Sequence, residues 1–235
     1  MAITFCSGSP YAWRVWLALE HKQLAHELKM LSFSGGDLRT PEFTRLNPRQ
    51  KVPVIEDGDF VLYESVAILE YLDEQYPQAG HGRLFPKDVR HRAIARRLIQ
   101  ETEYLAAPMR ELGGELFFKP ESGWDLETIA KGREALALEL ARFQRELRGE
   151  YLVYELSASD FTLYPWLALA VRMERKKPDL AIRSLIGASL SDWMRRIEAL
   201  PYFEKTIPPT GKPHEYGGPN RLRSRECLRR PRTRS

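Results

Sequence analysis

The run KVPVIEDGDFVLYESVAI, from Lys51 to Ile68, carries the clearest structural signal in this chain of 235 residues. Two short apolar segments, Val52–Ile55 and Phe60–Tyr63, flank the turn sequence Asp57-Gly58-Asp59. An Asp-Gly pair between two apolar segments predicts a β-hairpin, because these residues tolerate the positive φ angles that hairpin turns require. A helix is predicted to start at Ser65, so the run predicts a hairpin followed directly by a helix.

The residues before this hairpin predict a strand, a helix and a second strand. The apolar start ITFC (residues 3–6) is typical of a strand, and Tyr11–Lys22 places apolar side chains on one helical face. A second strand is predicted over His26–Met30, and a short helix over Pro41–Leu46. A strand–helix–strand order implies a parallel pair of strands, so residues 1–79 are predicted to form a small α/β domain.

Beyond this domain the signals for strands give way to signals for helices. Residues 80–88 are rich in glycine, proline and charge, and they are predicted to be a linker. Pro108 lies inside the first predicted helix that follows and predicts a kink there. An all-α second domain is predicted over residues 89–210, with amphipathic helices over Val89–Leu112, Asp125–Leu147, Asp160–Met173 and Leu190–Leu200.

The composition is that of a soluble globular protein, with 43% hydrophobic and 29% charged residues. No apolar run is long enough to span a membrane, and the first residues lack the features of a signal peptide. Because there are only two cysteines, Cys6 and Cys227, a disulfide framework is not expected and the predicted location is the cytoplasm. The five histidines show no spacing typical of metal ligands, so no metal is expected.

The net charge of +4 comes from a C-terminal tail, residues 211–235. From Arg221 onward this tail holds seven arginines and one acid, whereas residues 1–220 carry a net charge of −2. A basic tail can act as an arm for nucleic acid, but here no aromatic residues are interleaved for stacking. A solvated, disordered tail is therefore favoured, and nucleic-acid binding is not expected.

The motif Ser9-Pro10-Tyr11-Ala12 lies where the first strand gives way to the first helix. Backbone N–H groups at a helix start favour an anion such as a thiolate, and a hydroxyl there can donate a hydrogen bond to the sulfur. The spacing matches the C-P-Y-C site of glutaredoxins with both cysteines replaced, which would remove disulfide exchange. Ser-Pro is also a common helix cap, so the motif alone leaves both interpretations open.

Two further motifs follow in the hairpin run. Pro53 cannot donate to a strand ladder, so Val52-Pro53 is either a cis bond that turns the Val52 backbone toward a ligand or part of an edge strand. Glu64-Ser65 opens a helix, where the serine and the first N–H groups suit a ligand carboxylate and Glu64 suits an ammonium. Such a dipeptide alone is more often an ordinary helix cap.

The three motifs suit, in chain order, a thiolate, an extended peptide backbone and the head group of an amino acid. Glutathione offers all three features in one molecule. Here the chain resembles the cytosolic glutathione S-transferase family, in particular serine-type members such as the tau, zeta and theta classes. The resemblance covers roughly residues 1–207, through the stretches SPYAWRVWLAL, NPRQKVPVIEDGDFVLYESVAILEYLDEQYP, SASDFTLYPWLAL and RIEALPYFEK.

The resemblance implies a thioredoxin-like N-terminal domain with Pro53 cis, an all-α C-terminal helical bundle, and a helix-capping box at Ser157–Asp160. It implies that Ser9 is the catalytic hydroxyl, which stabilises the glutathione thiolate without acting as the nucleophile. The glutathione-binding residues that it implies are Val52 and Pro53 at the cysteinyl backbone, Glu64 and Ser65 at the γ-glutamyl end, and Gln50 or Lys51, with Lys51 preferred on charge, at the glycyl carboxylate.

The activity that the resemblance implies is transfer of this thiolate to a hydrophobic electrophile, with peroxidase activity as a second reaction, in a homodimer. Pro10-Tyr11 stand where zeta-type isomerases carry Ser-Cys, which disfavours maleylacetoacetate isomerisation. The shared WRV run nevertheless keeps a zeta-like isomerase as an alternative. A non-catalytic glutathione-binding regulatory protein is a further alternative, although the presence of Ser9 and Glu64-Ser65 argues against it.

The electrophile site is expected between the domains, along the long kinked helix. Ordinary helical core is an equally good interpretation of each candidate residue there. Cys6 is interpreted as a buried strand residue, because cysteine-type members of the family carry their thiol at the Ser9 position. The candidates for the electrophile site are Tyr11, Tyr104, Met109, Phe117 and Trp124.

Overall fold

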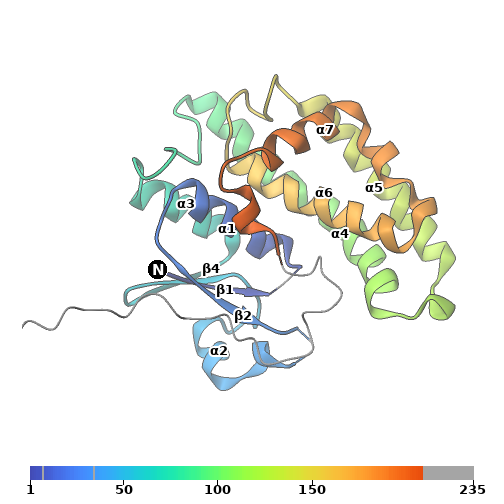
Figure 1. Ribbon diagram of the computed structural model, residues 1–235, viewed down its shortest axis with the longest axis horizontal. Coiled ribbons are helices and arrows are strands. Elements are labelled where there is room, and N and C mark those ends of the chain that lie inside the picture. Colours follow the sequence, from blue (N-terminus) through green and yellow to red (C-terminus); the bar gives the residue numbers. More distant parts are fainter. Residues whose placement is uncertain (7, 34, 209–235) are drawn as a thin grey trace, which may run out of the picture.

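A computed structural model of the protein describes residues 1–6, 8–33 and 35–208 (Figure 1). Strand β1 (Ala2–Cys6), helix α1 (Pro10–His21) and strand β2 (Glu27–Leu31) form the predicted strand–helix–strand unit, and β1 and β2 are parallel. The predicted basic tail, residues 211–235, lies outside the described residues, and so does the side chain of Cys6.

The predicted hairpin is formed by β3 (Val54–Asp57) and β4 (Phe60–Tyr63), with Gly58 at a positive φ of 65° in the turn. Strand β3 also pairs antiparallel with β1, which gives the sheet order β2-β1-β3-β4. Helices α1 and α3 (Ser65–Gln75) cover one face of this sheet, and α2 (Pro41–Leu46) covers the other (Figure 1). This is the predicted thioredoxin-like arrangement.

The second half is a layer of long helices, as predicted. These are α4 (Val89–Phe118), α5 (Leu126–Glu146), α6 (Ala158–Lys176) and α7 (Ile182–Glu198), followed by the short 3-10 helix η4 (Phe203–Thr206). Three of them are longer than their sequence patterns predicted. Helix α4 continues through Pro108 to Phe118, and α6 extends beyond the predicted residues at both ends. Helix α7 already starts at Ile182, and its first part escaped prediction because the non-helical Gly187 (φ 69°) interrupts the apolar period.

The capping box at the start of α6 is formed around Asp160, whose side chain is fully buried. Its carboxylate accepts hydrogen bonds from the Ser157 N–H at 2.9 Å, the Leu152 N–H at 3.0 Å and the Trp193 indole N–H at 2.8 Å. Burial raises the pKa of Asp160 to about 6, against the effect of these donors, so the group is ionised at neutral pH. The carboxylate thus joins α6 to α7 and to the loop before α6.

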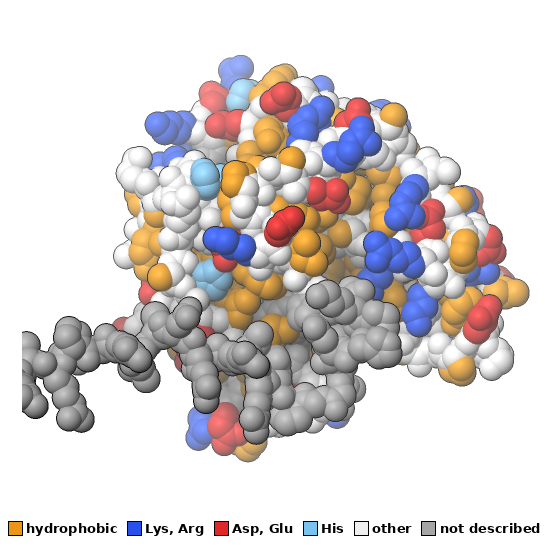
Figure 2. All heavy atoms as spheres, in the orientation of Figure 1, with side chains coloured by type: hydrophobic (Ala, Val, Ile, Leu, Met, Phe, Trp, Pro, Cys, Tyr) orange, Lys and Arg blue, Asp and Glu red, His pale blue; other side chains and the backbone are white. Residues whose placement is uncertain are grey.

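The two halves share one hydrophobic core. Ile3, Leu19 and Ile68 of the N-terminal half belong to the same buried cluster as Leu98 and Phe161 of the helical half. The face shown in Figure 2 has apolar side chains in its middle, flanked by Lys and Arg side chains over the helical half. Within the described part of the chain, no helix combines the length and the apolar content needed to cross a membrane.

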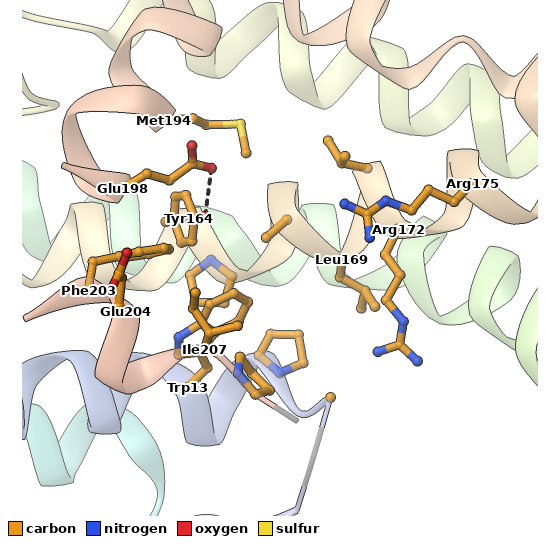
Figure 3. A pocket seen from close by; sticks show the side chains of 16 residues that line it. Trp13, Tyr164, Leu169, Arg172, Arg175, Met194, Glu198, Phe203, Glu204 and Ile207 are labelled. Atoms are coloured by element: carbon orange, nitrogen blue, oxygen red, sulfur yellow. Dashed lines mark hydrogen bonds between the residues drawn. The ribbon is translucent and has the colours of Figure 1, made fainter. Parts of the chain in front are cut away.

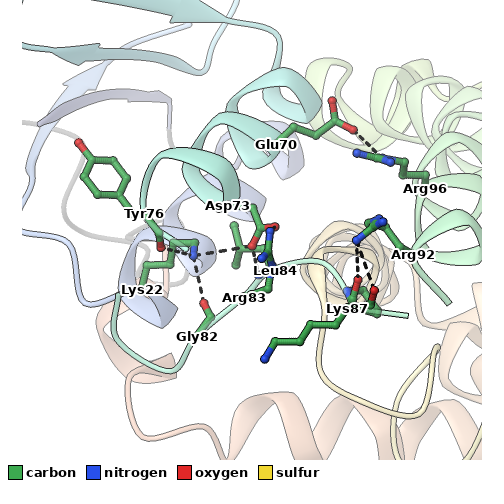
Figure 4. A network of polar contacts seen from close by, with 11 residues as sticks. Lys22, Glu70, Asp73, Tyr76, Gly82, Arg83, Leu84, Lys87, Arg92 and Arg96 are labelled. Carbon is green, nitrogen blue, oxygen red and sulfur yellow. Dashed lines mark hydrogen bonds and ion pairs between the residues drawn. The ribbon is translucent and has the colours of Figure 1, made fainter. Parts of the chain in front are cut away.

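Lys22, at the end of α1, holds the connection between the halves (Figure 4). Its ammonium group donates to the main-chain oxygens of Tyr76, at 2.8 Å, and Gly82, at 3.0 Å, and it lies 3.8 Å from the Asp73 carboxylate. The same carboxylate accepts a hydrogen bond from the Leu84 N–H at 2.6 Å. Residues 80–88, predicted as a linker, are therefore bound to α1 through Lys22 and to α3 through Asp73.

Gly80 marks the closest approach of this connecting segment to α1. Its φ of 57° is positive, and a Cβ atom there would lie 2.4 Å from the carbonyl carbon of Lys22. Neither the backbone angle nor the space admits a side chain, so the segment needs glycine at this position.

Candidate active site

Ser9 caps α1 at the carboxyl end of β1 and is 7% exposed. Its Oγ accepts a hydrogen bond from the Ala12 N–H at 3.3 Å, and Pro10 occupies the first helical position, where no N–H is needed. This bond uses a lone pair of Oγ, so the hydroxyl hydrogen stays available to donate to a ligand atom. The geometry therefore permits the thiolate contact that the sequence predicts.

The Val52–Pro53 peptide bond is cis, as the resemblance implies. Strand β3 begins at Val54 and not at Val52 as predicted, so the main-chain groups of Val52 lie outside the ladder of the sheet. The Val52 side chain is buried in a cluster with Ala12 and Trp16 of α1. This packing brings the Val52 main chain next to the first turns of the helix that Ser9 caps.

Asn47 fixes the loop that leads to Val52, and sequence reasoning missed it. This residue is 2% exposed, its amide donates to the Lys51 main-chain oxygen at 2.7 Å, and its Oδ1 accepts from the Arg49 N–H at 2.9 Å. Gln50 and Lys51 are exposed on this loop, with Gln50 at a φ of 53°. The Asn47-Pro48 pair after a helix is a turn signal that could have identified this support.

Glu64 precedes α3 with its side chain exposed and with an unusual backbone conformation, φ 69° and ψ 107°. Its side chain makes no capping hydrogen bond, whereas its main-chain oxygen accepts the first helical bond, from the Ile68 N–H at 3.0 Å. Ser65 is buried directly behind it. The first N–H groups of α3 are therefore left for another acceptor, as a helix start that binds a carboxylate requires.

A cavity of about 450 Å³ opens next to Ser9 (Figure 3). Gly8 and Pro10, on either side of Ser9, line it together with Trp13 of α1. The rest of the wall comes from α6, α7 and the segment after them, and is mainly apolar: Tyr164, Pro165, Ala168, Leu169, Val171, Met194, Phe203, Ile207 and Pro208. We call this space the interdomain cleft.

The interdomain cleft has an asymmetric distribution of charge. Arg172 and Arg175 of α6 lie on one side of it, and Glu198 and Glu204 lie on the other (Figure 3). The Tyr164 hydroxyl between them donates to Glu198 at 2.8 Å, and burial raises the pKa of Tyr164 above its ordinary value. Two arginines three residues apart on an otherwise apolar helix face are a sequence signal that could have identified this wall.

The short helix η4 and the residues after it, up to Pro208, form the wall of the interdomain cleft next to α1. The Trp13 indole N–H donates to the Thr206 hydroxyl of η4 at 3.2 Å, and the Trp13 ring packs edge-on against Tyr164. The three segments α1, α6 and η4 therefore meet at one side chain, although they are far apart in the sequence.

None of the residues predicted for the electrophile site lines the interdomain cleft. The inner face of α4 packs into the core, so Met109 is buried there and Tyr104 points to solvent. Phe117 lies against the Arg172 guanidinium, with 4.8 Å between Cζ and the ring centroid, and Trp124 lies near Lys177. Tyr11 turns toward α4 and donates to Glu103 at 2.9 Å. The cleft is built instead from α6, α7 and the segment after α7.

Comparisons with known proteins show the family to which the chain belongs. The family described as "Glutathione S-transferase, N-terminal domain" matches residues 8–75. A probable maleylacetoacetate isomerase of Vibrio cholerae is 33% identical over 85% of this chain and 92% of its own length. Glutathione S-transferase A of Pleuronectes platessa is 30% identical over 77% of this chain and 83% of its own length.

Among solved structures, the theta-class glutathione S-transferase of Xanthomonas axonopodis pv. citri, with glutathione bound, superimposes with a TM-score of 0.74. It is 26% identical, and the match covers 88% of this chain and 96% of that one. The protein therefore belongs to the glutathione S-transferase family. Its class of activity is that of a glutathione transferase. The described residues contain no cluster of His, Cys, Asp and Glu that could hold a metal ion.

Proposed function

We propose that the protein binds glutathione between Ser9, Val52 and Glu64-Ser65 and transfers its thiolate to an electrophile in the interdomain cleft. The observation that carries this proposal is the position of Ser9. It is a buried helix cap with a free hydroxyl hydrogen, and both of its neighbours in the chain line the cleft. A sulfur atom held there would lie between the peptide-binding groups and an apolar space for a second substrate.

Each end of glutathione has a matching group in this site. The γ-glutamyl carboxylate fits the Ser65 hydroxyl and the first N–H groups of α3, and the γ-glutamyl ammonium fits the exposed Glu64 carboxylate. The cysteinyl backbone fits the main-chain groups of Val52 that the sheet leaves unused. The glycyl carboxylate fits Lys51 or Gln50, which the Asn47 loop presents to solvent.

The chemistry follows from the placement of the sulfur. The Ser9 hydroxyl and the start of α1 stabilise the thiolate over the thiol, and each unit by which they lower the thiol pKa corresponds to about 1.4 kcal/mol. The sulfur then donates an electron pair to the electrophilic carbon, a carbon–sulfur bond forms, and the leaving group departs with its bonding electrons. The products are a thioether and the leaving anion.

Isomerisation of an acidic substrate is the second candidate function. Two observations favour it, the similarity to proteins named maleylacetoacetate isomerase and the arginine side of the interdomain cleft. In that reaction the thiolate adds to a conjugated double bond, the bond rotates, and the thiolate leaves again. Glutathione is then unchanged at the end, whereas conjugation consumes it, so the loss of free thiol during turnover distinguishes the two reactions.

The test is titration of the thiol of bound glutathione, followed by the ultraviolet absorbance of the thiolate. We expect wild type to lower the thiol pKa by one unit or more and Ser9→Ala to abolish most of this shift, with an activity loss of about 10- to 100-fold. Ser184→Ala, at an exposed serine of α7, is the control and keeps both values. Binding with an unshifted pKa would support a regulatory protein, and no binding would refute the proposal.

We further propose that the protein acts in the cytoplasm as a homodimer. The surface between α3 and α4 supports a two-fold interface, because acids and arginines alternate around a cavity of about 220 Å³ there, including Glu70, Glu74, Arg92 and Arg96. Such a mixed surface is complementary to a second copy of itself. Sedimentation of wild type and of Glu70→Lys tests this, with a shift toward monomer expected in the variant.

A further inference from the structure

Arg14, in the second turn of α1, carries a fully buried positive charge. Its exposure is 0%, and none of its three guanidinium nitrogens makes a hydrogen bond in the part of the chain that the structure describes. Its ion pair with Glu103 of α4 is long, with 3.8 Å between Nη2 and Oε1. A buried guanidinium normally has several acceptors, because its desolvation is otherwise only weakly compensated.

The guanidinium group lies beside the first turn of α1. Helical side chains point back toward the helix start, and the Arg14 Cζ atom is 4.6 Å from the centroid of the Tyr11 ring. Tyr11 lies in the first turn of α1, two residues after Ser9. The Tyr11 ring also packs perpendicular to Trp166 of α6, with 5.2 Å between ring centroids, which closes this region from the side of α6.

Solvent screens the charged groups around Tyr11 to different extents. The Glu103 carboxylate, which accepts the Tyr11 hydroxyl at 2.9 Å, has half of its side chain exposed, so solvent screens it. Arg14 is screened much less because it is buried. Burial first and Glu103 second raise the pKa of Tyr11 to about 12, and the positive charges of Arg14 and of Arg110 in α4 oppose this rise. Burial lowers the pKa of Arg14 to about 10, which leaves it protonated at neutral pH. Arg14 and Glu103 therefore act with opposite sign at the start of α1, and Arg14 is the less screened of the two.

We propose that Arg14 supplies part of the positive potential that stabilises the thiolate at Ser9, although it does not touch the substrate. This inference rests on the proposed function of the Ser9 site. Ser9 and the helix start would act on the sulfur directly, whereas Arg14 acts at longer range through a medium from which water is excluded. Glu103 sets the strength of this effect, because its carboxylate partly neutralises Arg14.

The test uses two variants that should move the thiol pKa of bound glutathione in opposite directions. Arg14→Met removes the cation and keeps an unbranched apolar side chain, and it should raise this pKa by about one unit. Glu103→Gln removes the screening charge from a half-exposed site and should lower the pKa by a few tenths of a unit. Glu101→Gln, on the same helix but paired with Arg97, is the matched control and should leave it unchanged.

The outcomes separate this inference from the function on which it rests. If wild type does not lower the thiol pKa, the proposed function itself fails. If wild type lowers it and neither Arg14→Met nor Glu103→Gln changes it, Arg14 has a structural role only and the inference is overturned. If Arg14→Met does not fold, Glu103→Gln decides alone, since a merely structural role predicts no decrease in the thiol pKa.

Discussion

Glu64 holds a backbone conformation that few residues other than glycine adopt, with φ at 69° and ψ at 107°. Such a conformation costs about 1–3 kcal/mol in a residue with a Cβ atom. The Glu64 side chain gives no compensating capping bond and lies exposed at the start of α3. A strained, exposed carboxylate at a helix start is compatible with the proposed contact with the γ-glutamyl ammonium.

Replacing Glu64 by glycine and by alanine should separate strain from binding. Both variants lose the carboxylate, so we expect the KM for glutathione to rise about 10-fold or more in each, with a smaller change in kcat. Glycine also relieves the backbone, so Glu64→Gly should be more stable than Glu64→Ala by about 1 kcal/mol. Denaturant unfolding and glutathione titration measure the two effects. Equal affinity in wild type and both variants would remove Glu64 from the site.

At the scale of the element, α1 carries functional groups along its whole length. Ser9 caps its start, and Arg14 lies in its middle. At its end, His21 contacts the helical half and Lys22 contacts α3 and the connecting segment. His21 Nδ1 lies 2.8 Å from the Tyr202 hydroxyl, and its ring packs against Phe161 and His81. Burial, followed by the neighbouring His81, lowers the pKa of His21 to about 4.

This pKa makes the stability of the fold depend on pH. Between about pH 6.5 and pH 4 the unfolded chain binds a proton at His21 that the folded chain does not, so acidification favours unfolding. The contribution of His21 is complete above about pH 6.5, and at about pH 5 some 2 kcal/mol of it should be lost. Denaturant unfolding at about pH 7.5 and about pH 5 should show this loss in wild type. The difference should shrink by that amount in His21→Gln, and an unchanged difference would contradict the assignment.

Elements whose signals are local in the sequence could be predicted well. The helix Pro41–Leu46, the strand Phe60–Tyr63, the Asp125 cap of α5 and the capping box of α6 were all predicted and are confirmed, because turn residues and caps define them. The prediction was wrong for the start of β3, where Pro53 excludes the preceding residues from the ladder. It also missed the early part of α7, where the non-helical Gly187 breaks the helical period.

The same distinction between local and long-range signals applies to the candidate site. Ser9, Val52-Pro53 and Glu64-Ser65 form motifs of two or three residues, so the sequence alone could suggest them. The walls of the interdomain cleft come from segments more than a hundred residues apart, such as Trp13 and Thr206, whose contact depends on the packing of α1 against η4. Periodicity identified α4 as an amphipathic helix but could not say whether its apolar side chains face a cleft or the core.

At the scale of the whole molecule, the shared core and the Lys22 network make the two halves one unit. Lys22 is fully buried. Together with Arg83 it supplies positive charge for Asp73, and it donates hydrogen bonds to two main-chain oxygens (Figure 4). Leu84 and Phe85, which follow in the connecting segment, are buried as well. The connection between the two halves thus combines the polar Lys22 network with buried apolar side chains.

Lys22→Met should therefore destabilise the protein by about 2–3 kcal/mol. Two main-chain oxygens lose their donor, and the buried Asp73 carboxylate keeps only Arg83, 3.4 Å away, as its cation. Lys29→Met is the matched control, since Lys29 pairs with Glu56 at the surface and should contribute less than about 1 kcal/mol. Limited proteolysis should cut Lys22→Met within residues 78–88 faster than wild type or the control. A cleavage rate equal to that of wild type would show that the network does not hold this segment.

Gly80 limits where this chain can be joined to a related chain to make a chimeric protein. Its Cβ position would overlap the main chain of Lys22, so the segment after α3 and the end of α1 form a matched pair. A chimera joined at residue 80 would combine a connecting segment from one parent with an α1 terminus from another. Only parents with glycine at this position would give a folded hybrid. A crossover inside α4, past Asp88, keeps both partners from one parent and is the better junction for domain shuffling.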